Sequence, residues 1–364
     1  MALKIGIVGL PNVGKSTIFN ALTRTKAAEA QNYPFCTIEP NVGIVEVPDH
    51  RIHKLAEISS SDKVIPTAIE FVDIAGLVQG ASEGEGLGNK FLSHIRECSA
   101  IAHIVRSFKD SNVTHVHGEV DPKFDREVIE SELLLSDIQT LEKRLEKAQS
   151  DAKSGDKEKK AYSDLLESIM MELKKGKMVA DMELTSEQKE QIQDLHFLSS
   201  KPYLYVVNLH EDDYKDFDKK QYADRLGMKD TNHIIPICAK MEEELADFSD
   251  TEAREYLTEL GLDEPGLDSL IKSAYNKLGL ITYFTSGPKE TRAWTIRKNT
   301  NAPQAAGKIH TDFETGFIKA EVIDWEDFIN SSGHSGARDQ GLVRMEGKDY
   351  VVTDGDVILF RFNN

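Results

Sequence analysis

Short runs of apolar residues alternate with longer amphipathic stretches along the first part of the chain. The apolar runs predict strands at Leu3–Val8, Val42–Val47, Ala68–Asp73 and Ile101–Arg106, and again at Tyr203–Asn208 and His233–Ile237. A helical pattern from about Lys15 to Lys26 follows the first strand. Strands that alternate with helices predict an α/β fold with a doubly wound, mostly parallel sheet, which binds its ligands at the carboxyl ends of the strands.

A different pattern interrupts this domain between about residues 125 and 200. Apolar residues recur at steps of four and three, the spacing of a coiled-coil seam, at Leu134, Ile138, Leu141, Leu145, Ala148 and Ala152 and again at Tyr162, Leu166, Ile169 and Leu173. A polar run around Gly155 separates the two sets. We expect an antiparallel coiled-coil hairpin whose first helix spans on the order of 40 Å and projects from the sheet domain. An ordinary solvated bundle helix is the alternative.

From Ile281 onward the pattern changes to short strands separated by turn signals. Strands are expected at Ala293–Ile296, Phe317–Val322, Tyr350–Val352 and Val357–Phe362, with a tight turn at 354–356 before the last. This pattern predicts a small α+β domain around a mixed or antiparallel sheet. The expected organisation is therefore one domain over 1–280, interrupted by the hairpin at 125–200, and a second domain over 281–364.

Composition and charge narrow the functional classes. The chain has 364 residues with 44 Lys+Arg and 62 Asp+Glu, a net charge of −18, which argues against indiscriminate coating of nucleic acid. Three isolated cysteines, Cys36, Cys98 and Cys238, exclude a disulfide framework and fit a reducing cytoplasm. No run approaches the roughly 18 apolar residues of a membrane span. We expect a cytoplasmic protein without a membrane partner.

The clearest chemical signal is Gly9–Ser16, which reads G-L-P-N-V-G-K-S and matches G-x-x-x-x-G-K-[ST] directly after a strand. In such a P-loop the backbone N–H groups, here including those of Asn12, Val13 and Gly14, surround the phosphates at a helix N-terminus. Lys15 would reach the β- and γ-phosphates, Ser16 would ligate Mg²⁺, and Thr17 would lie by the α-phosphate. The motif predicts a nucleoside-triphosphate site.

Two further segments indicate a switch-type NTPase. Asp73–Gly76 has the D-x-x-G pattern at the end of a strand, so Asp73 would hold Mg²⁺ through water and the Gly76 N–H would sense the γ-phosphate. Thr37 would complete the Mg²⁺ ligands when γ-phosphate is present, although an ordinary loop threonine is the alternative. The glycine-rich residues 77–88 are typical of a loop that a nucleotide orders or releases.

Base selection depends on Asn208–Glu211, N-L-H-E, at the position where guanine-specific relatives carry N-K-x-D. Cys238, Ala239 and Lys240 supply the loop that flanks the base. Loss of the guanine-reading Asp weakens guanine discrimination but does not create selectivity for adenine. From the residues alone, the base stays undecided.

The residues that place the attacking water are less clear. Leu77 stands where Ras-like enzymes carry a catalytic Gln, so we expect slow hydrolysis, below about 1 s⁻¹. His115 can position the water, but a surface-loop histidine is the alternative, and no cysteine or carboxylate cluster joins His115 and His117 in a metal site. Asn12 can instead help to hold a monovalent cation such as K⁺ beside the phosphates. Cys36 invites a redox role, although a structural cysteine is favoured because no basic neighbour adjacent in sequence would lower its pKa.

Long motifs resemble the YchF/Obg-like ATPase family across essentially the whole chain. They are Gly9–Ser16, Tyr33–Gly43, Phe71–Gly88, Asn208–Glu211 and Arg292–Phe313, the last containing A-P-Q-A-A-G-K-I-H-T-D-F. The resemblance implies a preference for ATP through N-x-x-E, with Asn208 and Leu209 contacting adenine. It also implies that His115 compensates for Leu77, that the C-terminal domain is a ubiquitin-like TGS domain, and that the protein associates with ribosomes.

Two hypotheses from different classes follow. The first is a Mg²⁺-dependent ATPase that acts as a nucleotide-gated switch on the ribosome or RNA. The alternative is a GTP-preferring or non-selective binding module in which hydrolysis is only a reset. A metabolic kinase is disfavoured because no acceptor-substrate motif is visible. The hairpin tip, with four lysines against two acids over 153–160, and the C-terminal sheet are candidate docking surfaces. We expect a monomer.

Overall fold

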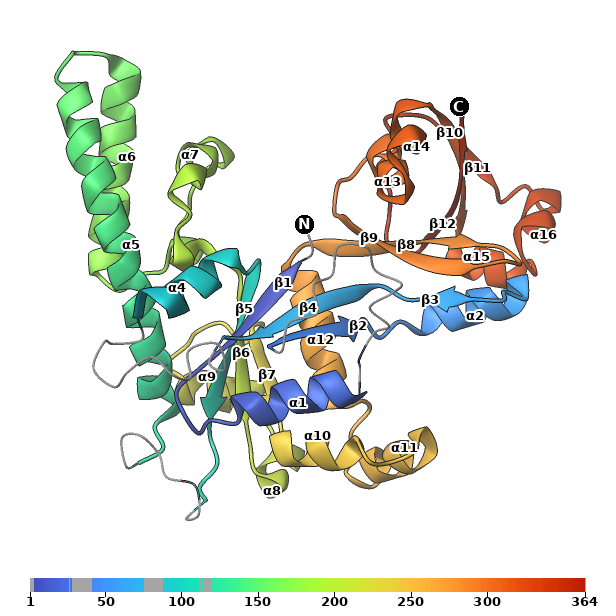
Figure 1. Cartoon of the computed structure of the whole chain (residues 1–364), viewed down its shortest axis with the longest axis horizontal. Coiled ribbons are helices and arrows are strands. Elements are labelled where there is room, and N and C mark those ends of the chain that lie inside the picture. Colours follow the sequence, from blue (N-terminus) through green and yellow to red (C-terminus); the bar gives the residue numbers. More distant parts are fainter. Residues whose placement is uncertain are drawn as a thin grey trace. The chain divides into compact units, whose positions relative to one another are not determined.

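The computed structural model describes residues 3–25, 27, 41–74, 88–110, 113 and 119–363. Among them the chain divides into two compact units. The first contains residues 3–25, 41–43 and 70–270, and the second contains residues 44–69 and 271–363. Two six-stranded sheets form the frameworks of these units (Figure 1).

The first sheet is parallel in the pairs that surround the P-loop strand. Its order is β2 (Val42–Glu46), β4 (Ala68–Asp73), β1 (Lys4–Val8), β5 (Ala100–Arg106), β6 (Tyr203–Asn208) and β7 (Ile234–Ile237). The predicted strands are therefore confirmed. Every residue of β5 and β6 is buried, as expected for parallel strands covered on both faces. The register sets Ile7 of β1 beside Asp73 of β4, so the carboxyl ends of these two strands lie together.

Helices connect the strands of the first unit along the chain. They are α1 (Lys15–Thr25), α4 (Gly88–Glu97), α8 (Glu211–Lys215), α9 (Lys219–Arg225), α10 (Ala239–Leu245) and α11 (Asp250–Glu259), with α12 (Gly266–Lys277) leading into the second unit. In α1 the residues Ile18, Phe19 and Leu22 form one buried face, which fixes the helix that begins at the P-loop. The predicted helix from Lys15 is confirmed.

Two long helices of the first unit form a hairpin, α5 (Pro122–Ala152) and α6 (Lys157–Lys174) (Figure 1). Asp121 caps the first helix and Asp156 caps the second by accepting backbone N–H groups, and Gly155 between them has φ +82°. The predicted turn near Gly155 is confirmed, whereas supercoiling of the helices stays a prediction. The sequence predicted helix as far as Ser200, but α6 ends at Lys174.

The residues after α6 form short elements because they bond to α5 instead of extending the hairpin. They are η2 (Val179–Asp181), α7 (Ser186–Gln191), η3 (Gln193–Leu195) and η4 (Leu198–Ser200). The buried carboxylate of Asp137 in α5 accepts the N–H groups of Leu198 and Ser199, both at 2.8 Å. This contact joins residues 61 and 62 positions apart, which no local pattern indicates.

The second sheet is mixed, as predicted. Its order is β11 (Arg344–Glu346), β10 (Phe317–Asp324), β12 (Asp356–Phe362), β8 (Leu280–Ser286), β9 (Thr291–Arg297) and β3 (Val64–Ile65). Short helices α13 (Ala302–Ile309), α14 (Thr311–Thr315), α15 (Trp325–Asn330) and α16 (His334–Asp339) connect the strands. The predicted strand at Tyr350–Val352 is wrong, because this segment makes only an isolated bridge at Val351 with Asn301, next to α13.

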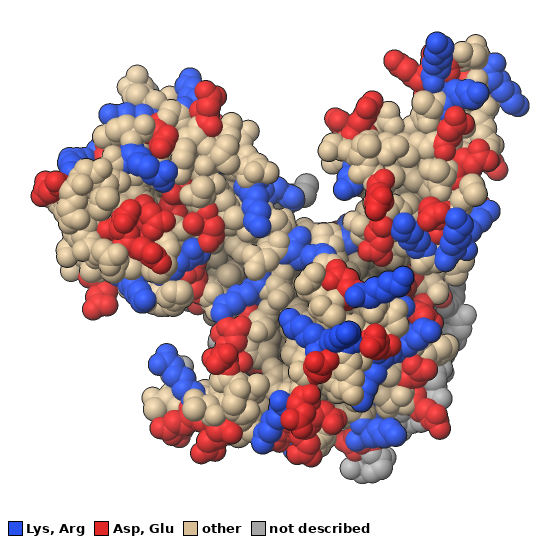
Figure 2. Space-filling view, turned by 180° about the vertical axis from the view of Figure 1, so that it is seen from behind, with Lys and Arg blue, Asp and Glu red and all other residues tan. Residues whose placement is uncertain are grey.

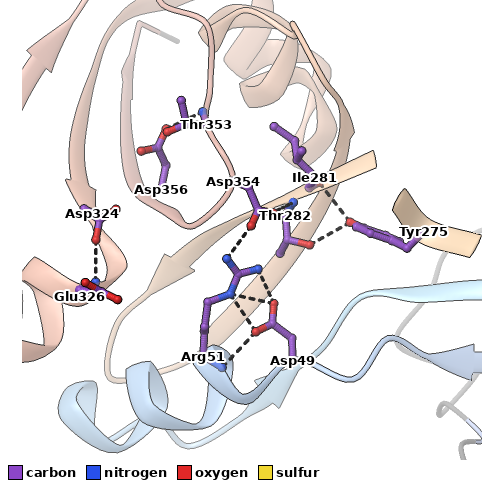
Figure 3. A network of polar contacts seen from close by, with 10 residues as sticks. All are labelled: Asp49, Arg51, Tyr275, Ile281, Thr282, Asp324, Glu326, Thr353, Asp354 and Asp356. Carbon is purple, nitrogen blue, oxygen red and sulfur yellow. Dashed lines mark hydrogen bonds and ion pairs between the residues drawn. The ribbon is translucent and has the colours of Figure 1, made fainter. Parts of the chain in front are cut away.

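Residues 50–65, which contain α2 and β3, pack with the C-terminal sheet, although the sequence assigned them to the domain over 1–280. Helix α2 (His50–Ser59) buries Ile52 and Leu55 in a cluster with Phe284 and Ile323, and β3 pairs with β9. Arg51 donates to Asp49 and to Asp354, each at 2.7 Å, while Asp354 also accepts the N–H of Thr282 (Figure 3). The second unit is therefore built from two segments that are far apart in sequence.

Among the described residues, no helix combines the length and the apolar character that crossing a bilayer requires.

Candidate functional site

The loop between β1 and α1 follows an unusual backbone path. Gly9, Asn12 and Gly14 have φ of +152°, +61° and +98°. A Cβ at Gly9 would collide with the carbonyl oxygen of Ile104, and one at Gly14 would collide with the Asn208 amide. Both glycines are therefore required by conformation and by close approach.

Lys15 lies inside this loop. Its side chain is buried, and its Nζ donates to the carbonyl of Leu10 at 2.6 Å. Desolvation lowers the pKa of Lys15 to about 8, and the nearby charge of Asp73 opposes that shift. The ammonium is thus held where the backbone turns, with a carboxylate in its field.

Ser16 and Asp73 come together across the ends of α1 and β4. The Ser16 hydroxyl donates to Asp73 Oδ2 at 3.4 Å, and Asp73 is only 5% exposed. A hydroxyl and a carboxylate are oxygen ligands of the type that Mg²⁺ prefers. The described residues contain no group of three or more His, Cys, Asp or Glu that could hold a metal ion by itself. The pair therefore fits an ion that takes its remaining ligands from phosphate and water.

A pocket of about 430 Å³ opens beside the P-loop. Its lining joins the predicted phosphate residues to the predicted base residues: Asn12, Gly14, Thr17, Phe108, Asp110, Val113, Asn208, Leu209, His210, Glu211, Cys238, Ala239, Lys240 and Glu243. This volume is within the usual range of small-molecule sites. Residues from the ends of β1, β5, β6 and β7 thus surround one cavity, as expected at the carboxyl edge of a parallel sheet.

Asn208 ties two walls of this pocket together. Its Nδ2 donates to the carbonyl of Val13 at 2.9 Å, and its Oδ1 accepts the N–H of Ala239 at 3.1 Å. The side chain is almost fully buried. Asn208 therefore holds the P-loop against the loop before α10, while its contact with adenine stays a prediction.

Glu211 is the first residue of α8, and its carboxylate accepts a hydrogen bond from Tyr256 of α11 at 3.1 Å. Leu209 and Cys238 are buried, and burial raises the pKa of the Cys238 thiol, which makes it a weak nucleophile. Lys240 is exposed at the start of α10.

Arg106 is a site residue that the sequence reasoning missed. It is 1% exposed at the end of β5, and its guanidinium lies 4.4 Å from the centroid of the Phe108 ring. It donates to four backbone carbonyls, those of Asn12, Phe108, Asp110 and Val113. One buried cation thereby fixes the pocket wall that follows β5 and contacts the P-loop. The signal available in the sequence was an arginine at the end of a mostly apolar strand.

Several predicted residues lie outside the described part of the chain. They are Cys36, Thr37, Gly76, Leu77, His115 and His117. Their predicted roles in Mg²⁺ binding, γ-phosphate sensing, water positioning and redox chemistry stay predictions.

A P-loop after the first strand of a parallel sheet, an aspartate at the end of the neighbouring strand, and a pocket that reaches the ends of β6 and β7 define a P-loop NTPase of the GTPase-like class. Comparison with known proteins agrees with this class. Residues 4–135 match a family model described as "50S ribosome-binding GTPase". Residues 280–363 match the YchF-GTPase_C model, described as "Protein of unknown function (DUF933)".

The chain belongs to the YchF family. It is 52% identical to the ribosome-binding ATPase YchF of Bacillus subtilis and 51% identical to that of Escherichia coli O157:H7, with 100% of both chains covered in each case. The fold is similar to that of the Schizosaccharomyces pombe YchF GTPase, with a TM-score of 0.88, 38% identity and coverage of 99% of this chain and 97% of that chain. A GTP-binding protein from Pyrococcus horikoshii, at 21% identity and a TM-score of 0.60, shares the fold.

Proposed function

We propose that this protein is a Mg²⁺-dependent ATPase that prefers ATP to GTP and acts as a nucleotide-gated switch on the ribosome or its RNA. The observation that carries the proposal is that one pocket of about 430 Å³ is lined by residues of both the P-loop and the N-x-x-E segment. The ribosome-binding ATPases named among its relatives support the nucleotide and the partner.

In this proposal Lys15 exchanges its bond to the Leu10 carbonyl for the β- and γ-phosphates of ATP. Ser16, Thr37 and, through water, Asp73 would hold Mg²⁺, which neutralises phosphate charge when it is bound. The P-loop N–H groups of Asn12, Val13 and Gly14 contribute dipoles that point to the same phosphates. The residues thus bind and orient the triphosphate before any bond breaks.

Slow turnover follows from the residue at position 77. A leucine cannot orient water, so His115 or a K⁺ ion beside Asn12 would have to help, and Gly76 would sense the γ-phosphate. Arg106 bonds to the carbonyls of Phe108, Asp110 and Val113, which precede His115 in the sequence. We therefore expect the backbone around Arg106 to influence both base binding and access to the phosphates.

Base preference is proposed to arise at the ends of β6 and β7. Asn208, Leu209, Glu211, Cys238, Ala239 and Lys240 line the same pocket as Asn12, Gly14 and Thr17 of the P-loop and α1. Steady-state turnover and affinity with ATP and GTP in parallel test this part. Equal or better performance with GTP would contradict it and would favour the GTP-preferring or non-selective module.

Docking is proposed to use the free end of the α5–α6 hairpin and the C-terminal sheet, which we take to be a TGS domain. Lys153, Lys157, Lys159 and Lys160 are exposed at the hairpin tip, where Figure 2 shows basic side chains on the surface. Lysines at a projecting tip can contact RNA phosphates although the whole chain is acidic. A cytoplasmic monomer is consistent with such a partner.

Co-sedimentation with ribosomes in the presence of ATP, of ADP and without nucleotide tests the switch. The proposal expects binding that differs between these states and weakens when the four tip lysines are replaced by glutamine. The exposed Lys219 and Lys220 of α9, which belong to neither proposed docking surface, provide a control variant with both replaced by glutamine. Absence from ribosomal fractions in every state would contradict the docking role and leave the ATPase role standing.

A further inference from the structure

Tyr256 lies behind the proposed base-reading carboxylate. It belongs to α11, a helix that begins at the capping box formed by Ser249 and Glu252. Its hydroxyl donates to Glu211 Oε1 at 3.1 Å, and its ring packs edge-on against Phe248 at 5.6 Å between centroids. Burial and the bond to Glu211 raise the pKa of Tyr256 to about 12. The phenol is therefore a hydrogen-bond donor across the physiological pH range.

The two purine bases make different demands on a carboxylate. Guanine presents two adjacent donors, N1–H and the N2 amino group, which both oxygens of one carboxylate can accept together. Adenine presents one donor, the N6 amino group, next to the N1 acceptor, which a carboxylate cannot serve. A carboxylate with both oxygens available therefore favours guanine, and one with a single oxygen available loses that advantage.

We infer that Tyr256 is a specificity-determining positioning residue: its bond to Oε1 of Glu211 holds that oxygen turned toward α11, so that the two carboxylate oxygens do not face the base together. The inference rests on the proposed function, because it needs Glu211 to face the base of a bound nucleotide. In this arrangement Glu211 meets the N6 amino group of adenine with one oxygen and cannot accept both donors of guanine. Tyr256 thus lowers the affinity for GTP without touching the nucleotide.

Geometry supports an indirect role. Glu211 lines the pocket, whereas Tyr256 is not among the lining residues and donates its hydrogen bond to the Glu211 carboxylate. The two residues are 45 positions apart, so the N-x-x-E motif contains no sign of this partner. Phe248 and Glu211 hold the tyrosine from its ring and its hydroxyl, which fixes the direction in which the hydroxyl points.

The variant Tyr256→Phe tests the inference, because it removes the hydroxyl and retains the ring against Phe248. Binding of non-hydrolysable ATP and GTP analogues is measured by titration calorimetry, together with kcat and KM for ATP and GTP. We expect the preference for ATP over GTP to fall about tenfold, mainly through tighter GTP binding, because a hydrogen bond to a charged group contributes at that level. The kcat for ATP should change less than about twofold, since no phosphate contact is altered.

A matched control is Tyr350→Phe in the second unit. The Tyr350 hydroxyl also donates to a carboxylate, Asp356 Oδ2 at 2.7 Å, but contributes nothing to the nucleotide pocket. It should leave the ratio of ATP to GTP affinity unchanged. If Tyr256→Phe weakens both nucleotides equally, the residue has only a structural role and the inference is overturned.

Glu211→Ala separates the inference from the proposed function. If this variant loses the preference for ATP while Tyr256→Phe retains it, the inference fails and base reading by Glu211 stands. If Glu211→Ala leaves the preference intact, base reading by this residue fails as well. If Tyr256 acts through Glu211 and Glu211 reads the base, the double variant should have the same preference for ATP over GTP as Glu211→Ala alone.

Discussion

The nucleotide site of the first unit and the sheet of the second unit differ in how far apart in the sequence their contacting residues lie. Lys15 and Ser16 follow β1 directly, and their partner Asp73 ends the strand beside it in the sheet. In the second unit, α2 and β3 come from residues 44–69, and the strands they pack against begin at Leu280. The first region is encoded in short motifs, whereas the second depends on contacts between distant segments.

This difference has a consequence for the switch. Residues 44–69 lie in the sequence between the two predicted switch segments, Thr37 with its loop and the stretch that starts at Asp73. Yet α2 and β3 are parts of the C-terminal unit. A nucleotide-driven change in either predicted switch segment would therefore act on the ends of a stretch of chain whose middle, α2 and β3, belongs to the second unit.

The largest expected effect comes from a substitution in the P-loop, the region that a short motif encodes. Lys15→Ala removes the ammonium that would bind the β- and γ-phosphates, so ATP turnover should fall by about 10² or more. The second unit should be unaffected, because none of its contacts involve this residue. Turnover assays and circular dichroism of the same sample measure both outcomes. Retained turnover would show that the P-loop lysine is not used as proposed.

Leu55→Ala disrupts the packing between α2 and the C-terminal sheet, which are far apart in the sequence. Leu55 is fully buried in α2, and removing a side chain of this size from a core costs about 3 kcal/mol. Hydrogen exchange should show lower protection of β8 and β12, while nucleotide affinity changes little. Leu135→Ala, at a leucine that is 54% exposed on α5, is the control and should be nearly neutral. Unchanged protection of β8 would contradict the grouping of residues 44–69 with the C-terminal unit.

Arg106→Met should have an intermediate effect. The substitution retains much of the buried volume but removes the guanidinium bonds to four backbone carbonyls, which loosens Phe108, Asp110 and Val113. Nucleotide affinity should weaken about tenfold. The binding constants of ATP and GTP measure this loss, which should be similar for both because Arg106 positions the wall and not the base-reading carboxylate. An unchanged affinity would show that the loop is held by other contacts.

The smallest expected effect is a pH dependence of binding. Desolvation places the pKa of Lys15 at about 8, and only the protonated amine attracts phosphate. Binding should therefore weaken as the pH rises through about 8, by up to tenfold per pH unit until the pKa of the bound state is reached. The free energy of unfolding changes in the opposite direction. Because burial lowers the pKa of Lys15 in the folded state, the folded protein should become more stable as the pH rises above about 8. Lys15→Ala should lack this dependence of binding; if it retains the dependence, another group titrates.

The sequence predicted much of the first unit because its signals are local. Burial on both faces makes β1, β5 and β6 nearly continuous apolar runs, and the P-loop has a fixed spacing around Gly9 and Gly14. The turn at Gly155 was predictable because glycine accepts the positive φ found there. Predictions weakened where polar contacts replaced periodicity, as in the segment bound by Asp137 and the non-strand at Tyr350–Val352.

The sequence by itself determined the class of this protein, its P-loop and the residues that line the pocket at the ends of β6 and β7, because each depends on spacing within one element or one turn. Only the tertiary structure decided that α2 and β3 pack with the C-terminal sheet, that Arg106 holds a wall of the pocket, and that Tyr256 contacts Glu211. The physical reason is that burial and hydrogen bonding act between groups that are close in space. Tyr256 and Glu211 are 45 positions apart, and Arg51 and Asp354 are 303 positions apart, so no periodicity of the chain records these contacts.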